Sequence, residues 1–165
     1  MMTRDFEPTD LPAVRACFIA LQDFEGALDP RLPSGPTIVD GYLEGLMRRC
    51  SAHGGRLFVS EEQSRVIGFV SVLGAVASNS PEDDPTPFAY VDDLVVLPEY
   101  RHQGHGRALL ERAEAYAVAS GRSSLRLRVK GRNQRARAFY AAAGYAEYEL
   151  ELEKRLRPAA RAHSE

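Results

Sequence analysis

Residues 90–110, YVDDLVVLPEYRHQGHGRALL, constrain the fold of this chain more than any other stretch. The apolar run at 94–97 predicts a buried strand that ends at Pro98. A loop with the pattern R-x-x-G-x-G then runs from Arg101 to Gly106. Apolar residues at helical spacing predict that a helix follows, and they are Leu109, Leu110, Ala113 and Tyr116. Because this order turns free N–H groups and a helix dipole toward one point, it predicts an anion site for a phosphorylated cofactor.

Other glycine-rich loops fit this segment less well. A dinucleotide fold needs G-x-G-x-x-G, but Leu109 occupies the sixth position here. The P-loop pattern G-x-x-x-x-G-K-[ST] is absent from the chain. The remaining alternative for the hexapeptide alone is a surface loop whose two glycines begin a helix.

Composition and length favour one ordinary globular domain. The chain has 165 residues, 44% of them hydrophobic and 27% charged, with a net charge of −2. No apolar run approaches the ~18 residues of a membrane span, and the polar, acidic N-terminus does not resemble a signal peptide. The two cysteines, Cys17 and Cys50, fall in expected helices and favour a reduced, cytoplasmic protein.

The charge is unevenly distributed along the chain. Residues 61–99 carry eight acidic residues and one basic residue, whereas residues 101–137 carry ten basic and two acidic ones. A nucleic-acid binder is one interpretation of the basic segment, but no recognised binding motif accompanies it. Since the basic segment begins at the expected anion site, cofactor phosphates explain part of the excess, and the other arginines belong to the solvated surface.

The remaining elements follow from periodicity, capping residues and turn signals. Helices are expected at 10–26, capped by Thr9, at 37–52, and from Asn133 or Gln134 to 143. Strands are expected near 2–6 and at 56–60, 66–77, 123–129 and 145–153. The last of these alternates strictly between apolar side chains and glutamates, which predicts a half-exposed strand.

The loop and a downstream cluster together resemble the acyl-CoA-binding motif of the GNAT N-acetyltransferase superfamily. The loop reads Arg101-His102-Gln103-Gly104-His105-Gly106 after Val96-Leu97-Pro98. The cluster contains Asn133, then Ala138-Phe139-Tyr140, then Gly144-Tyr145. The resemblance covers residues 55–153 well and the first 54 only loosely, and it departs from the family at His102, where many members have glycine.

The resemblance implies an α/β fold with a mixed, mostly antiparallel sheet of six to seven strands and helices on both faces. Two neighbouring parallel strands, here at 91–97 and 123–129, are expected to splay apart at the cofactor site. Residues 1–157 are expected to form a single N-acetyltransferase domain, and residues 158–165 a flexible tail.

The resemblance also implies which residues bind acetyl-CoA. A bulge near 94–96 is expected to free backbone groups for the pantetheine arm, while His102 and His105 flank the phosphates. The expected cofactor-binding residues are Leu94, Val95, Val96, Arg101, His102, Gln103, Gly104, His105, Gly106, Arg107, Asn133 and Tyr140. For the first three, an ordinary buried strand is the alternative.

Tyr140 is expected to stabilise the leaving thiolate, as the matching family tyrosine does. An unperturbed tyrosine has a pKa near ~10 and a thiol near ~8.5, so a hydrogen bond to the developing charge is favoured over full proton transfer. Asn133 lies seven residues earlier and therefore on the same helical face. The alternative is that Tyr140 only packs in the core beside Phe139.

Asp92 and Asp93 carry the expectation about the acceptor, because adjacent acids within an apolar strand are costly unless they face a polar cleft. Polyamine and amino-sugar acetyltransferases resemble this stretch, with Glu-Asp at the same place. By that match Asp92 is the first candidate for the base that deprotonates the amine, and Asp93 the second. Alternatively, both acids only attract a cationic acceptor or pair with an arginine.

Together these features predict an acetyl-CoA-dependent N-acetyltransferase that acts on a primary amine of a small cationic or amino-acid-like acceptor. Alternatives are a protein or peptide amine as acceptor, or a non-catalytic acyl-CoA sensor on the same fold. No metal site, nucleic-acid partner or membrane partner is expected. Many relatives are dimers, and the exposed strand near Glu149 could pair in a homodimer. The acceptor is expected to contact the first two helices and the loop at 78–87.

Overall fold

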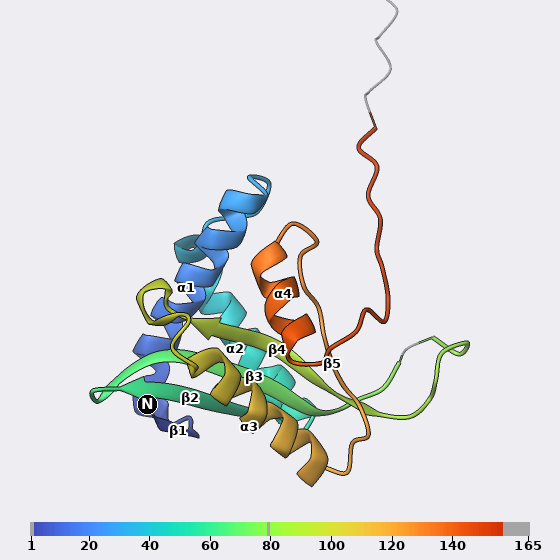
Figure 1. Ribbon diagram of the computed structural model, residues 1–165, viewed down its shortest axis with the longest axis horizontal. Helices are drawn as coiled ribbons and strands as arrows, with labels where there is room; N and C mark the ends of the chain where they lie inside the picture. Colours follow the sequence, from blue (N-terminus) through green and yellow to red (C-terminus); the bar gives the residue numbers. More distant parts are fainter. Residues whose placement is uncertain (1, 79, 157–165) are drawn as a thin grey trace, which may run out of the picture.

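The computed structural model describes residues 2–78 and 80–156, and Figure 1 shows one central sheet with helices around it. The sheet order is β1-β2-β3-β4-β5. The strands are β1 (Met2–Asp5), β2 (Arg56–Glu62), β3 (Arg65–Val76), β4 (Phe88–Val96) and β5 (Leu125–Leu127). The helices are α1 (Leu11–Leu28), α2 (Gly35–Ala52), α3 (His105–Ala119) and α4 (Gln134–Ala142), with short 3₁₀ turns η1 (Pro8–Asp10) and η2 (Pro98–Tyr100).

The sheet is mixed and mostly antiparallel, as predicted. Strands β1 to β4 pair antiparallel, and β5 pairs parallel with β4. The parallel pairing joins residues 89–91 to β5, from Ala89↔Leu125 to Val91↔Leu127, and then ends. Because β4 continues to Val96 without β5 beside it, the two strands splay apart where the resemblance predicted an opening.

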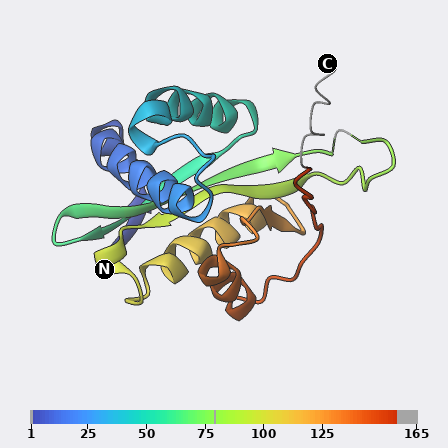
Figure 2. The ribbon, with the colours of Figure 1, turned by 90° about the horizontal axis from the view of Figure 1, so that it is seen from above.

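Two hydrophobic layers hold the helices on opposite faces of the sheet. Figure 2 shows α1 and α2 on one face and α3 and α4 on the other. The α1–α2 layer is centred on Phe18, Leu46 and Phe69, and the α3 layer on Ile67 and Leu109. A Cβ on Gly68 would lie 2.5 Å from the Val95 carbonyl oxygen, so only glycine lets β3 approach β4 this closely.

The predicted strand at 145–153 is wrong, and among the described residues the sheet has five strands instead of six or seven. This segment is extended, but no strand among the described residues lies beside it to satisfy its backbone groups. The alternation of apolar and acidic residues therefore identified a segment that could join a sheet, but it could not show whether a neighbouring strand is present. The strand expected at 123–129 is also shorter, at Leu125–Leu127. Residues 158–165, expected to be a flexible tail, lie outside the described residues.

The predicted cap at Thr9 is also wrong, because Thr9 lies inside η1. Asp10 closes this turn: its carboxylate accepts a hydrogen bond from the Glu7 backbone N–H at 2.8 Å and pairs with Arg4 at 2.7 Å. Helix α2 begins at Gly35, two residues earlier than predicted, since Pro36 fits the first helical turn. Within the described ranges, no helix is long and apolar enough to cross a membrane.

Candidate active site

The R-x-x-G-x-G loop forms a backbone cradle at the start of α3. His102 has φ of +60° and Gly104 has φ of +90°, and these left-handed residues reverse the chain into the helix. The first helical hydrogen bond runs from the Ala108 N–H to the Gly104 carbonyl at 3.0 Å. The N–H groups of His105, Gly106 and Arg107 therefore lack helical acceptors, and they can hold an anion.

Two arginines concentrate positive charge beside this cradle. Burial, and next the neighbouring charge of Arg135, lower the pKa of Arg101. Arg101 donates from Nε to the Val96 carbonyl at 2.8 Å, which fixes the loop to the end of β4. Arg135 reaches across from α4 and contacts Nε2 of His102 at 2.9 Å. A bound anion would relieve the repulsion between the two guanidinium groups.

The open edge of β4 lies next to the cradle. The Leu97 N–H bonds to the Ile67 carbonyl on β3 at 2.9 Å, so strand alternation turns the N–H groups of Leu94 and Val96 the other way, toward the gap left by β5. A Cβ on Gly106 would lie 3.6 Å from Phe139 and 3.9 Å from Leu94. The cradle, the open edge and α4 therefore converge in one place.

A β-bulge at Asp92 determines where the two adjacent acids point. Val72 pairs with Val91 and Ser71 pairs with Asp93, so Asp92 is the extra residue in β4. The predicted bulge at 94–96 is wrong, because pairing with β3 is regular there. In a regular strand adjacent side chains point to opposite faces, but the bulge interrupts this alternation. Both carboxylates consequently face α2.

Asp93 is a buried carboxylate held by two hydroxyl groups. It is 7% exposed, and the Tyr42 hydroxyl donates to its two oxygens at 2.9 and 3.0 Å. The Ser71 hydroxyl lies 3.4 Å from Oδ2 and accepts the Asp93 backbone N–H at 3.0 Å. Burial, and next the charge of Asp92, raise the pKa of Asp93 to about 7. The hydrogen bonds from Tyr42 and Ser71 and the charge of Arg49 act in the opposite direction and limit this rise in the pKa. Because the resulting pKa lies near neutral pH, the Asp93 carboxylate can both accept and release a proton there.

Asp92 has a different environment, because it forms an ion pair with Arg49. The Arg49 Nε lies 2.7 Å from Oδ2 of Asp92, and its guanidinium carbon lies 5.3 Å from the centre of the Tyr42 ring. The Arg49 guanidinium thus occupies one oxygen of the Asp92 carboxylate, which gives that carboxylate a charged partner within the chain. The geometry therefore favours Asp93 over Asp92, the first candidate from sequence, as the base.

Tyr140 lies within electrostatic reach of the same carboxylate. Burial, and second the charge of Asp93, raise the pKa of Tyr140, so its hydroxyl stays protonated as a donor. Its ring packs against Phe139 and Tyr145 at 5.1 and 5.7 Å between centroids. Among the described residues nothing bonds to the hydroxyl of Tyr140, which leaves it available. Asn133 caps α4, where its Oδ1 accepts the Ala136 N–H at 3.0 Å.

The side chains of the loop divide into those beside the cradle and those directed elsewhere. The prediction that the His105 side chain flanks the phosphates is wrong: it is 2% exposed and bonds through Nδ1 to Ser60 on β2 at 2.9 Å. Its buried ring instead anchors the first turn of α3 to the sheet. Gln103 donates to the Glu99 carbonyl at 3.0 Å, and Arg107 pairs with Glu111 at 2.8 Å.

Three residues around Asp93 were not identified as site residues from the sequence: Tyr42, Arg49 and Ser71. Tyr42 matched the apolar stripe of its helix, yet Arg49 lies seven residues later on the same face. Ser71 is a polar residue within the apolar run of β3. A tyrosine and an arginine on one helical face, and a serine in a buried strand, were available signals, but only the fold directs Tyr42 and Ser71 at Asp93 and Arg49 at Asp92.

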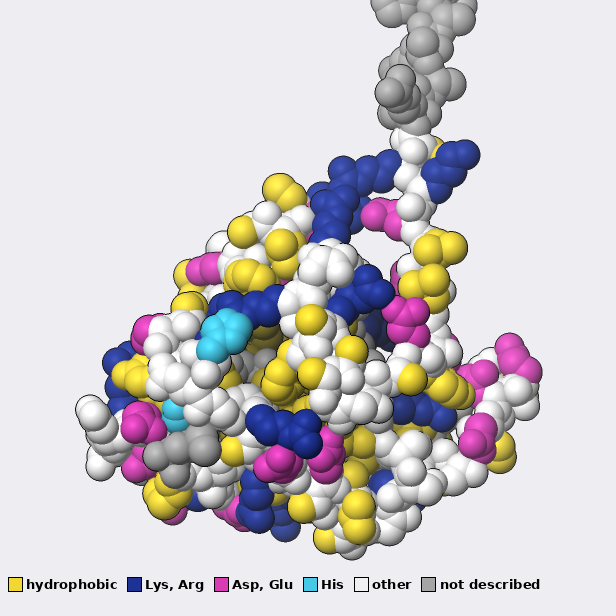
Figure 3. All heavy atoms as spheres, viewed as in Figure 1, with side chains coloured by type: hydrophobic (Ala, Val, Ile, Leu, Met, Phe, Trp, Pro, Cys, Tyr) yellow, Lys and Arg dark blue, Asp and Glu magenta, His cyan; other side chains and the backbone are white. Residues whose placement is uncertain are grey.

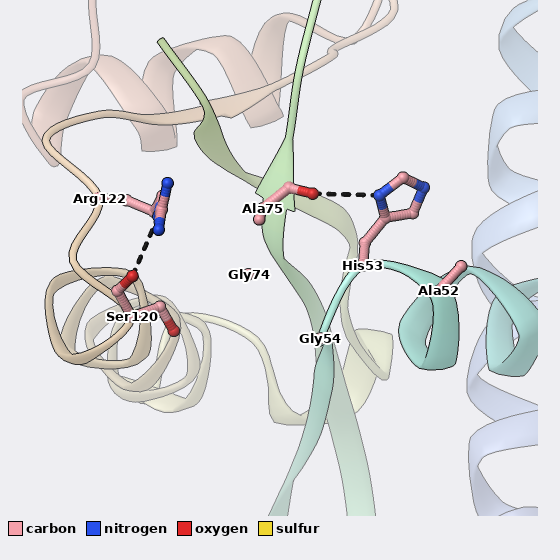
Figure 4. A pocket seen from close by; sticks show the side chains of 7 residues that line it. All are labelled: Ala52, His53, Gly54, Gly74, Ala75, Ser120 and Arg122. Atoms are coloured by element: carbon pink, nitrogen blue, oxygen red, sulfur yellow. Dashed lines mark hydrogen bonds between the residues drawn. The ribbon is translucent and has the colours of Figure 1, made fainter.

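A separate hollow of about 380 Å³ lies where α2 and α3 end, away from these residues (Figure 4). His53 Nδ1 contacts the Ala75 carbonyl at 3.1 Å, and Arg122 Nε donates to the Ser120 carbonyl at 3.0 Å. The His53 side chain thus ties the end of α2 to β3, and the Arg122 side chain closes the turn that follows α3. None of the predicted site residues lines this hollow. In the described part of the chain, no cluster of three or more His, Cys, Asp or Glu side chains could hold a metal ion.

Comparison with known proteins identifies the family from the sequence. The sequence model of the Acetyltransferase (GNAT) family matches residues 21–145. A thialysine N-ε-acetyltransferase from Bos taurus is 42% identical over 55 residues, which cover 33% of this chain and 32% of the bovine protein. An uncharacterised N-acetyltransferase from Methanocaldococcus jannaschii is 31% identical over 109 residues, 66% of this chain and 46% of the archaeal one. The chain thus spans a third to a half of these relatives.

Solved structures share the fold over nearly the whole chain. The BH1408 protein from Bacillus halodurans superposes with a TM-score of 0.82 at 20% identity, covering 94% of this chain and 100% of that one. An aminoglycoside N-acetyltransferase, AAC(6')-Iy, in complex with CoA superposes with a TM-score of 0.67 at 18% identity, covering 95% and 100% of the two chains. At these identities the superpositions show a common fold.

Proposed function

Because the chain belongs to the GNAT acetyltransferase family, we propose that it is an N-acetyltransferase that moves an acetyl group from acetyl-CoA directly to a primary amine of a small cationic or amino-acid-like acceptor. The observation that carries this proposal is the buried carboxylate of Asp93, which shares one electrostatic environment with the hydroxyl of Tyr140. One group accepts a proton near neutral pH, and the other donates a hydrogen bond.

The donor binds along the cradle and the open edge of β4. The free N–H groups at the start of α3 hold the pyrophosphate, with Arg101 and Arg135 beside it. The N–H groups of Leu94 and Val96 pair with the pantetheine amides and polarise the thioester carbonyl. CoA in the structurally similar aminoglycoside acetyltransferase supports this class of donor.

Asp93 and Tyr140 assist the two halves of the proposed transfer, the attack by the amine and the departure of the sulfur. The amine nitrogen forms the new bond to the acyl carbon and loses a proton, which Asp93 accepts directly or through water. The C–S bond breaks, and the hydroxyl of Tyr140 donates a hydrogen bond to the departing sulfur, which leaves as the thiolate. Asp93 then releases its proton to water, and the thiolate takes up a proton from water to become the thiol. Asp92, held by Arg49, supplies negative charge that attracts a cationic acceptor.

An acceptor panel tests the activity. Free CoA released from acetyl-CoA is measured with polyamines, thialysine, lysine, aminoglycosides and an N-terminal peptide. We expect turnover with at least one small amine and little with the peptide. Turnover confined to the peptide would reassign the acceptor class, and binding of acetyl-CoA without turnover on any amine in a wide panel would contradict the proposed reaction.

Gly106→Val should raise the dissociation constant for acetyl-CoA at least tenfold while the protein stays folded. A Cβ at position 106 would lie at ordinary contact distance from the protein atoms around it. The loss of affinity would therefore come from a collision with the bound phosphates or pantetheine. Calorimetric titration measures the affinity. Gly41→Val is the matched control, because a Cβ there meets nothing within 4 Å. Unchanged affinity in folded Gly106→Val would contradict the role of the cradle.

Two substitutions around Asp93 should move the acidic limb of the kcat/KM profile in opposite directions. The Tyr42 hydrogen bond lowers the pKa of Asp93, so Tyr42→Phe should move the limb to higher pH. The charge of Asp92 raises that pKa, so Asp92→Asn should move the limb to lower pH. Rate profiles between pH 5 and 9 measure both. A limb that stays in place in both variants would mean that another group controls the rate.

A further inference from the structure

The two strands that border the open gap carry opposite charges just beyond the point where they separate. Strand β5 pairs with β4 as far as Val91↔Leu127, so Asp92 on β4 and Arg128 after β5 are the first residues past the last pair. Side chains at matched positions of neighbouring strands lie on the same face of a sheet. The gap therefore has an anionic wall on the side of β4 and a cationic wall on the side of β5.

The side chain of Arg128 belongs to the face of the sheet that α1 and α2 cover, which is also the face of the two acids. Leu125 and Leu127 pack into the α3 layer on the other face. By alternation along the chain, Arg126 and Arg128 point to the α1–α2 face. Arg126 agrees with this direction, because it pairs with Tyr90, and Tyr90 packs against the α1–α2 layer.

Tyr90 lies between the two charged walls. Burial raises the pKa of its half-buried hydroxyl, so this group stays protonated and can donate a hydrogen bond. The positive charge of Arg128 acts against this rise, whereas the negative charges of Asp92 and Asp93 add to it. In the described part of the chain, the Tyr90 hydroxyl has no hydrogen-bond partner. The acids, this hydroxyl and Arg128 thus follow one another across the gap.

Arg128 differs from the basic residues near it, which have partners in the chain. The Arg126 guanidinium lies 3.9 Å from the centre of the Phe88 ring, and Arg132 donates to the Leu28 carbonyl at 3.1 Å. Within residues 2–78 and 80–156, Arg128 forms no hydrogen bond or ion pair. Figure 3 shows Lys and Arg side chains beside α4 and β5 on this side of the molecule. An arginine without a partner at the border of a gap can bind the carboxylate of a ligand.

The charges around the gap suit a zwitterion better than a polyamine. Arg49 already pairs with Asp92, so Asp93 is left to face the amine of the acceptor and Arg128 to face its other end. A second ammonium group beside Arg128 would be repelled, because the two charges have the same sign. A carboxylate there would be attracted, and the planar guanidinium can hold both of its oxygens. The Tyr90 hydroxyl is placed to donate to the same carboxylate.

We propose that the acceptor is an amino acid, or a close derivative with a free carboxylate, and that Arg128 and the Tyr90 hydroxyl bind this carboxylate while the amine faces Asp93. This assignment rests on the proposed acetyl transfer and narrows its acceptor class. Diamines of the same length lack the group that Arg128 binds, so they are poorer acceptors. Arg128 determines specificity and takes no part in the transfer of protons.

Pairs of amines that differ only in the carboxylate test this assignment. Lysine, ornithine, histidine and tyrosine are each compared with the amine that lacks the carboxylate, by kcat/KM for CoA release from acetyl-CoA. For the pairs that are turned over, the wild type should favour the amino acid by about tenfold or more, the usual contribution of a hydrogen bond to a charged group. Arg128→Gln should remove most of this preference by raising KM for the amino acid, with kcat little changed.

Three further variants sharpen the test. Arg128→Glu should reverse the preference in favour of the diamines, because the new charge attracts a second ammonium group. Tyr90→Phe should raise KM for the amino acid several-fold, since it loses one donor to the carboxylate. Arg48→Gln is the matched control: it removes the same charge at a side chain that is 74% exposed on α2, so it should keep the wild-type preference.

Calorimetric titration of the same pairs into the CoA-bound protein separates this assignment from the proposed reaction, because binding needs no turnover. Tighter binding of the amino acid that is lost in Arg128→Gln would support the carboxylate site, and without turnover of any amine it would contradict the acetyl transfer alone. Equal or faster turnover of the amines without a carboxylate, or a preference that survives Arg128→Gln, would overturn the carboxylate site alone. Neither binding nor turnover of any pair would overturn both.

Discussion

Tyr140→Phe should lower kcat by about 10²- to 10³-fold, which is about 2.7 to 4 kcal/mol of transition-state stabilisation. The hydroxyl is proposed to act only as the C–S bond breaks, so its benefit belongs to the transition state. Affinity for acetyl-CoA should stay within a few-fold, since the ring keeps its contacts with Phe139 and Tyr145. Steady-state kinetics and calorimetric titration measure the two effects.

The stability of this variant separates a chemical role from a packing role. Because the described residues offer the hydroxyl no hydrogen-bond partner, its removal should change the free energy of unfolding by less than about 1.5 kcal/mol. Tyr145→Phe is a matched control on the neighbouring ring: it loses a hydroxyl bonded to Glu114, and its kcat should remain near the wild-type value. Normal turnover by Tyr140→Phe, or its unfolding, would identify Tyr140 as a packing residue.

Asp93→Asn should lower kcat by about 10²- to 10⁴-fold at neutral pH, the usual range for the loss of a general base. The asparagine amide keeps the size of the side chain but cannot accept the proton. Higher pH should restore part of the rate, because more of the acceptor amine is then uncharged. Single-turnover rates across pH measure this recovery. A larger loss in Asp92→Asn than in Asp93→Asn would return the base to Asp92.

The wild-type profile follows from the same carboxylate. Asp93 acts as a base only when ionised, and its pKa is raised to about 7. The rate should therefore fall as the pH drops through about 7, with half of the activity lost near that value. In Asp93→Asn this limb should disappear. An unchanged limb in that variant would assign it to the acceptor amine or to another residue.

The anion cradle could be predicted because local order determines it, whereas the splayed strands were expected only from the resemblance to the family. An apolar strand, two glycines and a helix start are consecutive in the chain, so residues 94–106 build the cradle almost by themselves. Asn133 and Tyr140 could be paired for the same reason, since one short helix carries both. Backbone conformation and spacing within about a dozen residues were sufficient for these features.

The choice between Asp92 and Asp93 required the tertiary structure. The sequence identified the pair, but alternation would have sent the two side chains to opposite faces. The bulge turns both side chains toward α2. There Arg49, 43 positions from Asp92, pairs with Asp92, and Tyr42, 51 positions from Asp93, donates to Asp93. Desolvation by this long-range packing raises the pKa of Asp93, and no local pattern contains that information.

Residues 145–153 show the same division between local pattern and tertiary structure. From the sequence alone, strict alternation at 145–153 determined an amphipathic, extended segment, and Pro98 with the glycines of 104–106 determined where β4 ends and the cradle begins. Only the tertiary structure decided that residues 145–153 have no strand beside them in the described part of the chain and that Asp93 is buried under Tyr42. Dihedral preferences and periodicity act between near neighbours, whereas strand partners and desolvation depend on segments that meet only when the chain has folded.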